Sequence, residues 1–142
     1  MDDLLTQLQE GLSRSPDFAN FLGIRLRSAT RDEIVADLEI RPDLGQSAGI
    51  AHGGVLMSFA DTLGGIGASV NLPPGTATIT LESKTNFLAP APTGSIVTGR
   101  SEILHRGRRT TVWQTRISNA DGRLLAQITQ TQMVIEQPQP AS

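Results

Sequence analysis

One aspartate stands inside the longest apolar stretch of this chain. Residues 53–70 read GGVLMSFADTLGGIGASV, and Asp61 is the only charged residue among them. The run predicts a helix that is apolar on every side and is therefore buried. A buried, unpaired carboxylate is costly and Asp is a poor helix former, so Asp61 is predicted to serve chemistry rather than stability. The alternative is a structural carboxylate that caps a loop or pairs with an arginine.

The residues that open this helix have a complementary chemistry. Ala51-His52-Gly53-Gly54 precedes the apolar run, and glycines let another group approach the backbone closely. A helix N-terminus presents unpaired N–H groups and a partial positive charge, which stabilise the oxyanion of acyl transfer when they face a carbonyl. The segment therefore predicts an oxyanion site at Gly53, with the carboxylate eight residues further on.

The spacing of these two features favours a site shared between subunits. Eight residues of helix rise about 12 Å, whereas a reacting carbonyl must lie ~3 Å from each group. A symmetric dimer with antiparallel central helices brings the N-terminus of one helix to the carboxylate of the other. A second carboxylate, or a long-range role for Asp61, satisfies the same spacing, so these alternatives stay open.

Other catalytic arrangements find little support. The chain has two histidines, His52 and His105, and no cysteine, G-x-S-x-G, H-E-x-x-H or P-loop sequence. A serine-hydrolase triad, a thiolate metal site and a phosphate-binding loop are therefore not expected. Gly64-Gly65-x-Gly67 lies inside the predicted helix and is interpreted as permitting close packing. We expect no metal and no redox cofactor.

The first half of the chain predicts the elements that come before this helix. Leucines at helical spacing predict a helix over 2–12, and Ser15-Pro16 predicts the N-cap of a short second helix. Two short strands are expected next, at 25–30 and 33–40. Residues 41–51 are expected to be irregular because proline and glycine interrupt any periodicity.

The second half predicts an antiparallel sheet. Segments rich in Thr, Ile and Val are expected to form a four-stranded meander over 76–87, 95–106, 109–118 and 123–135. In the first segment Ile79, Leu81 and Phe87 share one parity and are expected to share one face. Asn119–Gly122 and Arg106–Arg108 are typical of hairpin turns. The pattern predicts an α+β domain in which an antiparallel sheet wraps a central helix.

Length and charge narrow the functional classes. With 142 residues and a net charge of −2, we expect one domain over 1–142, a core at about 18–135, a frayed tail at 136–142 and no nucleic-acid partner. The apolar run is near the lower limit for a membrane span and contains Asp61, so a buried helix is favoured over a membrane segment. The acidic, amphipathic N-terminus is unlike a signal peptide, and a cytoplasmic location is expected.

A longer motif surrounds the His-Gly-Gly sequence. It reads Gln46-x-x-Gly49-x-x-His52-Gly53-Gly54, then Asp61, and is supported by Asn86-Phe87-Leu88-Ala89-Pro90-Ala91. This combination resembles the hot-dog-fold acyl-coenzyme A thioesterases of the PaaI-like branch, over roughly residues 18–135. The resemblance implies the hot-dog fold and hydrolysis of an acyl- or aroyl-CoA to the free acid and coenzyme A.

The resemblance also implies roles for single residues. The Gly53 N–H polarises the thioester carbonyl, and Asp61 of the partner subunit acts as nucleophile or general base. Gln46 holds the thioester or the attacking water. His52 is expected to orient the loop rather than to transfer a proton.

A further set of residues is implied to contact the substrate. Thr80 is suggested as a water-positioning hydroxyl, and the hairpin arginines as contacts to the coenzyme A phosphates, which arginine matches well. Ordinary exposed charge is the alternative for these arginines. The implied assembly is a homodimer with shared sites, with a tetramer left open. The implied contact set is Gly54, Thr80, Phe87, Pro90, Gly107, Arg108 and Arg109.

Two other functions fit the same scaffold. A non-catalytic acyl-CoA binding or sensing module is the main alternative, although binding alone does not need the carboxylate of Asp61. A dehydratase or hydratase is disfavoured because the histidine-centred loops of those enzymes are not evident in the sequence.

Overall fold

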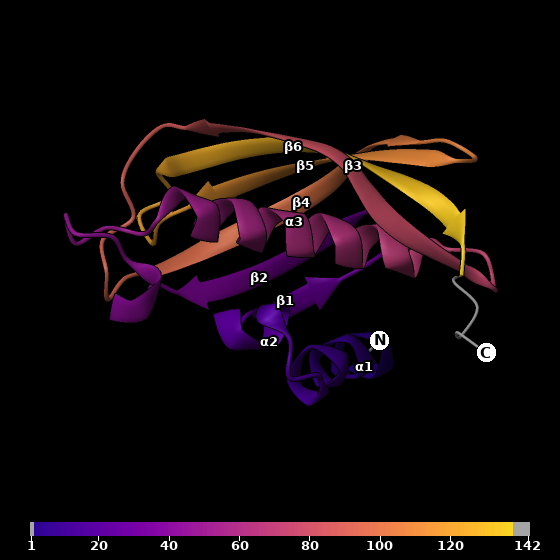
Figure 1. Cartoon of the computed structure of the whole chain (residues 1–142), viewed down its shortest axis with the longest axis horizontal. Coiled ribbons are helices and arrows are strands. Elements are labelled where there is room, and N and C mark those ends of the chain that lie inside the picture. The colour runs from indigo at the N-terminus through magenta and orange to yellow at the C-terminus, as the bar shows by residue number, and fades with distance from the viewer. Residues whose placement is uncertain (1, 138–142) are drawn as a thin grey trace.

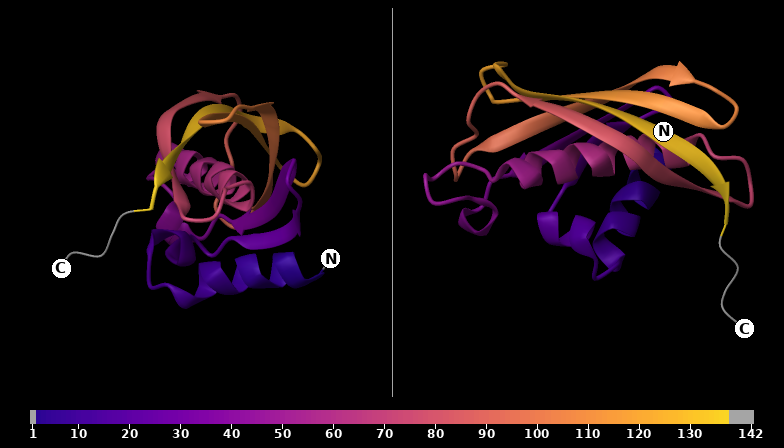
Figure 2. Two further views of the ribbon diagram at one scale, coloured as in Figure 1. Left: turned by 90° about the vertical axis from the view of Figure 1, so that its right-hand side faces the viewer. Right: turned by 45° about the horizontal axis from the view of Figure 1, so that its top comes forward.

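A six-stranded antiparallel sheet curves around one long helix (Figure 1). The computed structural model describes residues 2–137. Its elements are α1 (Asp2–Arg14), α2 (Phe18–Leu22), β1 (Arg25–Ala29), β2 (Glu33–Glu39), the 3₁₀ helix η1 (Pro42–Leu44), α3 (Gly53–Val70), β3 (Thr76–Phe87), β4 (Ile96–Arg106), β5 (Thr110–Ser118) and β6 (Leu124–Glu136). The predicted α+β architecture, with a sheet wrapped around a central helix, is confirmed (Figure 2).

The strand order corrects one prediction. The strands follow β1-β2-β4-β5-β6-β3, so β4, β5 and β6 form a meander, and the predicted meander that also contains β3 is wrong. The α3 helix has 18 residues, a rise of about 27 Å, which carries the chain along the sheet before β3 begins. β3 therefore pairs with β6 at one edge, while β4 returns to pair with β2.

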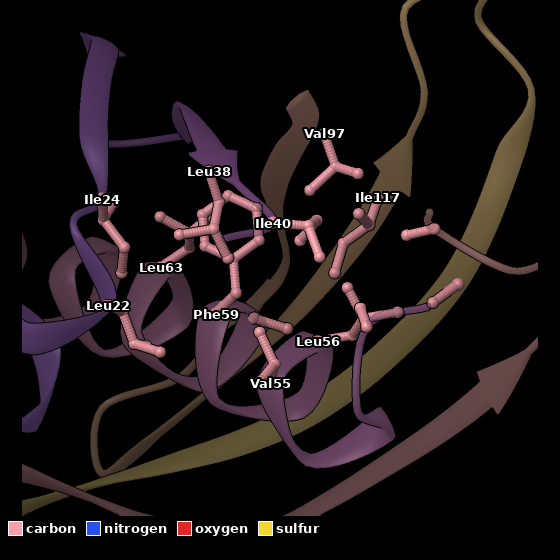
Figure 3. Close-up of a cluster of buried hydrophobic side chains, with 14 of the residues drawn as sticks. Leu22, Ile24, Leu38, Ile40, Val55, Leu56, Phe59, Leu63, Val97 and Ile117 are labelled. Carbon is pink, nitrogen blue, oxygen red and sulfur yellow. The ribbon is translucent and has the colours of Figure 1, made fainter. Parts of the chain in front are cut away.

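The core lies between α3 and the concave side of the sheet. Phe59 and Leu63 are fully buried there and lie among Leu38 and Ile117 (Figure 3). At Gly99 of β4 an added Cβ would lie 2.7 Å from the Leu63 side chain and 2.9 Å from that of Phe59. The absence of a side chain at this position therefore lets the helix approach the strand closely.

Two glycines of α3 are needed for close packing. An added Cβ would lie 2.4 Å from the Gln130 amide at Gly64 and 2.5 Å from the Trp113 ring at Gly67. At Gly65 nothing lies within 4 Å. The packing interpretation is confirmed for Gly64 and Gly67, whereas at Gly65 no neighbour within the described chain tests it.

The α3 helix is not buried on every side, contrary to the prediction. Met57 is 40% exposed, and Asp61 and Ser69 are also exposed. Residues four apart lie on the same side of a helix, and the sheet curves around the other sides (Figure 2). In the single chain Asp61 is therefore an exposed carboxylate on an uncovered stripe of α3.

A β-bulge divides β3 into two parts with opposite parity. The register with β6 shifts between Thr80 and Glu82, which makes Leu81 the extra residue. Thr80 and Phe87, which differ in parity, both face α3 as a result. The prediction that Ile79, Leu81 and Phe87 share one face is wrong, because parity is lost across the bulge.

The N-terminal helices also differ from prediction at their junction. α1 extends to Arg14, and α2 begins at Phe18. The N-cap of α2 is Asp17, whose carboxylate accepts the Asn20 N–H at 3.0 Å. The predicted N-cap at Ser15 is therefore wrong. Asp is a strong N-cap residue, and the extended backbone at Asp17 has the geometry that capping needs.

The remaining segment boundaries agree closely with prediction. Both hairpin turns of the second half are present, between β4 and β5 and between β5 and β6. The tail begins later than predicted, since Glu136 closes β6 and the Gln137 N–H donates to the Gly75 carbonyl. Residues 138–142 of the predicted tail lie outside the described residues. Within residues 2–137 no helix is both long and apolar enough to cross a membrane.

Candidate active site

The start of α3 presents a free backbone donor. His52 is the N-cap, and its Nδ1 accepts the Gly54 N–H at 2.9 Å. The Gly53 N–H, one residue earlier, has no acceptor among residues 2–137. It lies at the positive end of the helix dipole. This geometry suits the predicted oxyanion donor and gives His52 a capping function.

Gly53 lines a largely apolar pocket of about 330 Å³. The ring of Phe87 lies against Gly53, where an added Cβ would be 3.1 Å from the ring. Four residues predicted from the sequence are brought together here, since Gln46 and Pro90 also line the pocket. The lining residues are Gln46, Ile50, Ala51, Gly53, Leu56, Phe87, Ala89, Pro90 and Ala91.

Gln46 lines this pocket with donor hydrogens available. Its Oε1 accepts the Ala48 N–H at 2.7 Å, which ties the side chain to its own turn. That turn includes Gly49, whose φ of 76° favours glycine. The Gln46 Nε2 has no acceptor within the described residues, so it remains free to bind a ligand.

Asp61 lies about two turns further along α3 in a polar setting. Thr80 Oγ1 donates to Asp61 Oδ1 at 2.7 Å, and Gln130 Nε2 approaches the same oxygen at 3.3 Å. The structure thus places the predicted water-positioning hydroxyl against the predicted catalytic carboxylate. Within residues 2–137 Asp61 forms no ion pair, which disfavours a structural role as the partner of an arginine.

Two buried glutamines that sequence reasoning missed complete this polar cluster. Gln130 and Gln132 of β6 are 0% and 2% exposed. Gln132 Nε2 donates to Thr80 Oγ1 at 2.7 Å, and Gln132 Oε1 accepts from Thr78 Oγ1 at 2.9 Å. The sequence contains a signal for them, because both share the parity of the buried Ile128 and so occupy inward positions of the strand.

The hairpin residues of the predicted contact set lie at the other end of α3. Gly107 and Arg108 line a second pocket of about 280 Å³, together with residues that follow the helix. Arg106 forms an ion pair with Asp32 at 2.6 Å. Arg108 and Arg109 are exposed and have no acidic partner in the described part of the chain.

One chain therefore gathers the predicted residues into three groups. The first is the apolar pocket at Gly53, the second joins Asp61 to Thr80, and the third is the hairpin with Arg108. Gly53 and Asp61 remain separated along the same helix, as their spacing requires. Over residues 2–137 there is no group of three or more His, Cys, Asp or Glu side chains that could hold a metal ion.

The sheet wrapped around α3 and the polar groups along that helix define a hot-dog-fold protein. The profile of the thioesterase superfamily matches residues 48–126, which contain the His-Gly-Gly sequence and Asp61, and this chain belongs to that family. The thioester-hydrolase class predicted from the motif is confirmed. A 1,4-dihydroxy-2-naphthoyl-CoA hydrolase from Listeria monocytogenes is 33% identical over 104 residues, covering 73% of this chain and 84% of the relative.

Solved structures support the same assignment. A thioesterase from Haemophilus influenzae is 29% identical, with a TM-score of 0.85 over 97% of this chain and 94% of its own. A hypothetical thioesterase from Streptococcus pneumoniae, whose structure includes coenzyme A, is 26% identical, with a TM-score of 0.74 over 82% of this chain and 88% of its own. The Escherichia coli PaaI protein shares the fold, with a TM-score of 0.83, 22% identity and 94% coverage of each chain. The predicted resemblance to hot-dog thioesterases is confirmed.

Proposed function

We propose that this protein hydrolyses an acyl- or aroyl-coenzyme A thioester to the free acid and coenzyme A. The observation that carries the proposal is the free N–H of Gly53, a residue that begins an 18-residue helix and lines an apolar pocket. Such a donor favours the transition state over the ground state, because it faces the oxygen on which negative charge develops.

The pocket suits the acyl group of the substrate. Its walls are mainly aliphatic, with the Phe87 ring beside Gly53 and the free amide of Gln46 as a polar donor. An aromatic ring offers a planar acyl group a favourable face or edge contact. The Listeria relative, which is named as a hydrolase of a naphthoyl-CoA, supports aromatic acyl groups among the substrates.

The bond-breaking step needs a group close to the bound carbonyl carbon. Asp61 of the partner subunit supplies it, either by attacking that carbon or by removing a proton from the attacking water. The C–S bond then breaks, and the sulfur leaves as the coenzyme A thiolate, which takes up a proton. In the nucleophilic route this leaves an acyl–aspartyl anhydride, and water attacks its acyl carbon, breaks the bond to Asp61 and restores the carboxylate. Water supplies the second carboxyl oxygen of the product acid in both routes.

A homodimer is supported by two uncovered surfaces that adjoin one another. β3 is an edge strand of 12 residues, and Ile79 and Leu81 on it are 44% and 52% exposed. The unpaired backbone groups of an edge strand can pair with another strand, and these two exposed apolar side chains favour covering the edge. Antiparallel pairing of two β3 strands would cover this edge and bring the uncovered stripes of the two α3 helices together.

The same arrangement accounts for the separate positions of the pocket and the hairpin. Antiparallel helices that bring Gly53 to the partner's Asp61 place the N-terminal end of one α3 beside the middle of the other, whose C-terminal half continues beyond it. The acyl pocket of one subunit then lies on the same side of the dimer as the β4–β5 hairpin of the partner. The hairpin of the first subunit lies away from this pocket, at the C-terminal end of the first subunit's α3. Coenzyme A extends from the reacting carbonyl toward that hairpin, where Arg108 and Arg109 meet its phosphates.

The first experiment measures thiol release from a panel of acetyl-, octanoyl- and benzoyl-CoA. We expect wild-type protein to hydrolyse at least one of them, and Asp61→Asn to lower kcat by at least ~10²-fold. Because Asp61 is exposed in the chain, its variant should melt close to wild type. Asp121→Asn, in the exposed turn between β5 and β6, is the control and should keep full activity.

Two outcomes would contradict the proposal. The first is an Asp61→Asn protein with near wild-type turnover. The second is a wild-type protein that binds acyl-CoA in a calorimeter but releases no thiol, which would favour the non-catalytic binding module.

A further inference from the structure

We propose that Gln130 and Gln132 are positioning residues that hold the Asp61 carboxylate in one orientation, with Oδ1 bound and Oδ2 free. The inference rests on the proposed function, in which Asp61 attacks the thioester or activates water. It adds two residues that do not touch the substrate and a reason for the glycine at position 64.

The hydrogen-bond chain behind Asp61 has a defined direction. Thr78 Oγ1 donates to Gln132 Oε1, so the Gln132 amide directs its Nε2 hydrogens away from Thr78. One of them is donated to Thr80 Oγ1 at 2.7 Å. The Thr80 hydroxyl then directs its only hydrogen at Asp61 Oδ1, 2.7 Å away. Gln132 thus makes Thr80 a donor to the carboxylate rather than an acceptor.

Gln130 reaches the same oxygen from the other side of the cluster. Its Nε2 lies 3.3 Å from Asp61 Oδ1 and 3.4 Å from the Asp61 carbonyl oxygen. The opposite orientation of the amide would place Oε1 against the carboxylate, which is repulsive. Two donors therefore meet at Oδ1, while Oδ2 has no partner within residues 2–137. The free Oδ2 is the oxygen assigned to the reaction.

The packing around Gln130 indicates that its buried amide does not serve the stability of the fold. A Cβ added at Gly64 would lie 2.4 Å from Cδ and Nε2 of Gln130, so an alanine would displace the amide. Glycine inside a helix is less favourable than alanine, because it loses more conformational freedom on folding. The buried Gln130 Oε1 has no hydrogen-bond partner among the described residues, which adds a further cost. An apolar side chain at position 130 with alanine at 64 avoids both costs.

The central test replaces each glutamine with methionine, which has a similar length and no amide donors. We expect Gln130→Met and Gln132→Met to lower kcat ~10- to 10²-fold, the effect of a misplaced catalytic group. KM should change little, because neither residue contacts the substrate. The melting temperature of Gln130→Met should hold or rise, since an unpaired buried oxygen is removed. Gln127→Met is the matched control, because Gln127 lies on β6 with the opposite parity and should keep wild-type kcat.

A double variant separates positioning from general packing. In an Asp61→Asn background, Gln130→Met should change the residual kcat by less than ~2-fold, because it acts through the missing carboxylate. Gly64→Ala should lower kcat as Gln130→Met does, because it displaces the amide without removing a polar group. Equal losses of kcat in the wild-type and Asp61→Asn backgrounds would overturn the proposal, as would full activity of Gln130→Met.

Crystal structures of wild type and Gln130→Met give a readout that does not depend on turnover. We expect one ordered Asp61 rotamer in wild type, with Oδ1 against Thr80, and several rotamers in the variant. A single, unchanged Asp61 rotamer in Gln130→Met would overturn the positioning proposal, whatever the kcat of that variant. Conversely, a wild-type protein without thioesterase activity would end the proposed function, while the Asp61 rotamers would still decide whether the glutamines orient it.

Discussion

Gly53 contributes a backbone N–H rather than a side chain. A substitution by proline removes this one donor directly. It is the first helical residue after the N-cap His52, whose ψ of 136° is compatible with a following proline. Proline is favoured at the first position of a helix because that N–H has no helical partner. The proposed oxyanion donor can therefore be deleted with little expected disturbance of α3.

We expect Gly53→Pro to lower kcat ~10²- to 10³-fold relative to Gly53→Ala, the effect of losing one oxyanion donor. Both variants add a Cβ near the Phe87 ring, where it would lie at 3.1 Å. The alanine variant therefore controls for crowding of the pocket and retains the N–H. Steady-state kinetics with the best acyl-CoA substrate measure the difference. Equal kcat values in the two variants would remove the oxyanion function from Gly53.

His52 is expected to act through its cap. We predict that His52→Ala destabilises the protein by about 0.5–2 kcal/mol, the usual effect of losing an N-cap. His52→Asn should restore most of that stability and most of the activity, because an Asn side chain also accepts the N–H of the first turn. Chemical denaturation and kinetics of both variants test this. An inactive but fully stable His52→Asn protein would instead indicate a direct chemical role.

Among the elements, the β4–β5 hairpin has arginines that differ in whether an acidic residue already pairs with them. Arg108 and Arg109 are free of acidic partners in the described chain, whereas Arg106 is paired with Asp32. We expect Arg108→Ala and Arg109→Ala to raise KM for acyl-CoA and to leave kcat nearly unchanged, since phosphate contacts far from the carbonyl give uniform binding. The KM increase should shrink at high salt.

Arg100→Ala, on β4 and outside the hairpin pocket, is the control. It removes the ion pair with Glu33 and should leave KM unchanged. Measurements of kcat and KM at two salt concentrations make the comparison. An unchanged KM in both the Arg108 and Arg109 variants would return these residues to ordinary surface charge.

At the scale of the whole molecule, the shared-site dimer makes a quantitative prediction. Neither an Asp61→Asn chain nor a Gly53→Pro chain should form an active homodimer. In a heterodimer of the two, one site combines the intact Gly53 with the intact Asp61 of the partner subunit. Random mixing of equal amounts should therefore restore about a quarter of wild-type activity.

Refolding the two variants together, with mass spectrometry to verify subunit exchange, provides the measurement. Proven heterodimers that stay inactive would contradict a site built from both subunits. In that case a second carboxylate or a long-range role for Asp61 would become the preferred explanation.

Local sequence patterns were enough to predict the local features of this protein. The boundaries of the helix over residues 53–70 and of the strand over 76–87 were predicted as they occur, because periodicity and turn residues act over short distances. The longer motif around His-Gly-Gly, together with Asp61, also indicated the chemistry and the family. These features depend on neighbouring residues alone.

Only the tertiary structure decided which residues meet across the fold. The position of β3 at the sheet edge follows from pairing with β6, which no local pattern encodes. The bulge at Leu81 brings Thr80 and Phe87 to one face, although their parity separates them. The open side of α3 exposes Asp61, which composition had predicted to be buried. Gln130 was overlooked for the same reason, because its contact with Asp61 joins residues 69 positions apart in the chain.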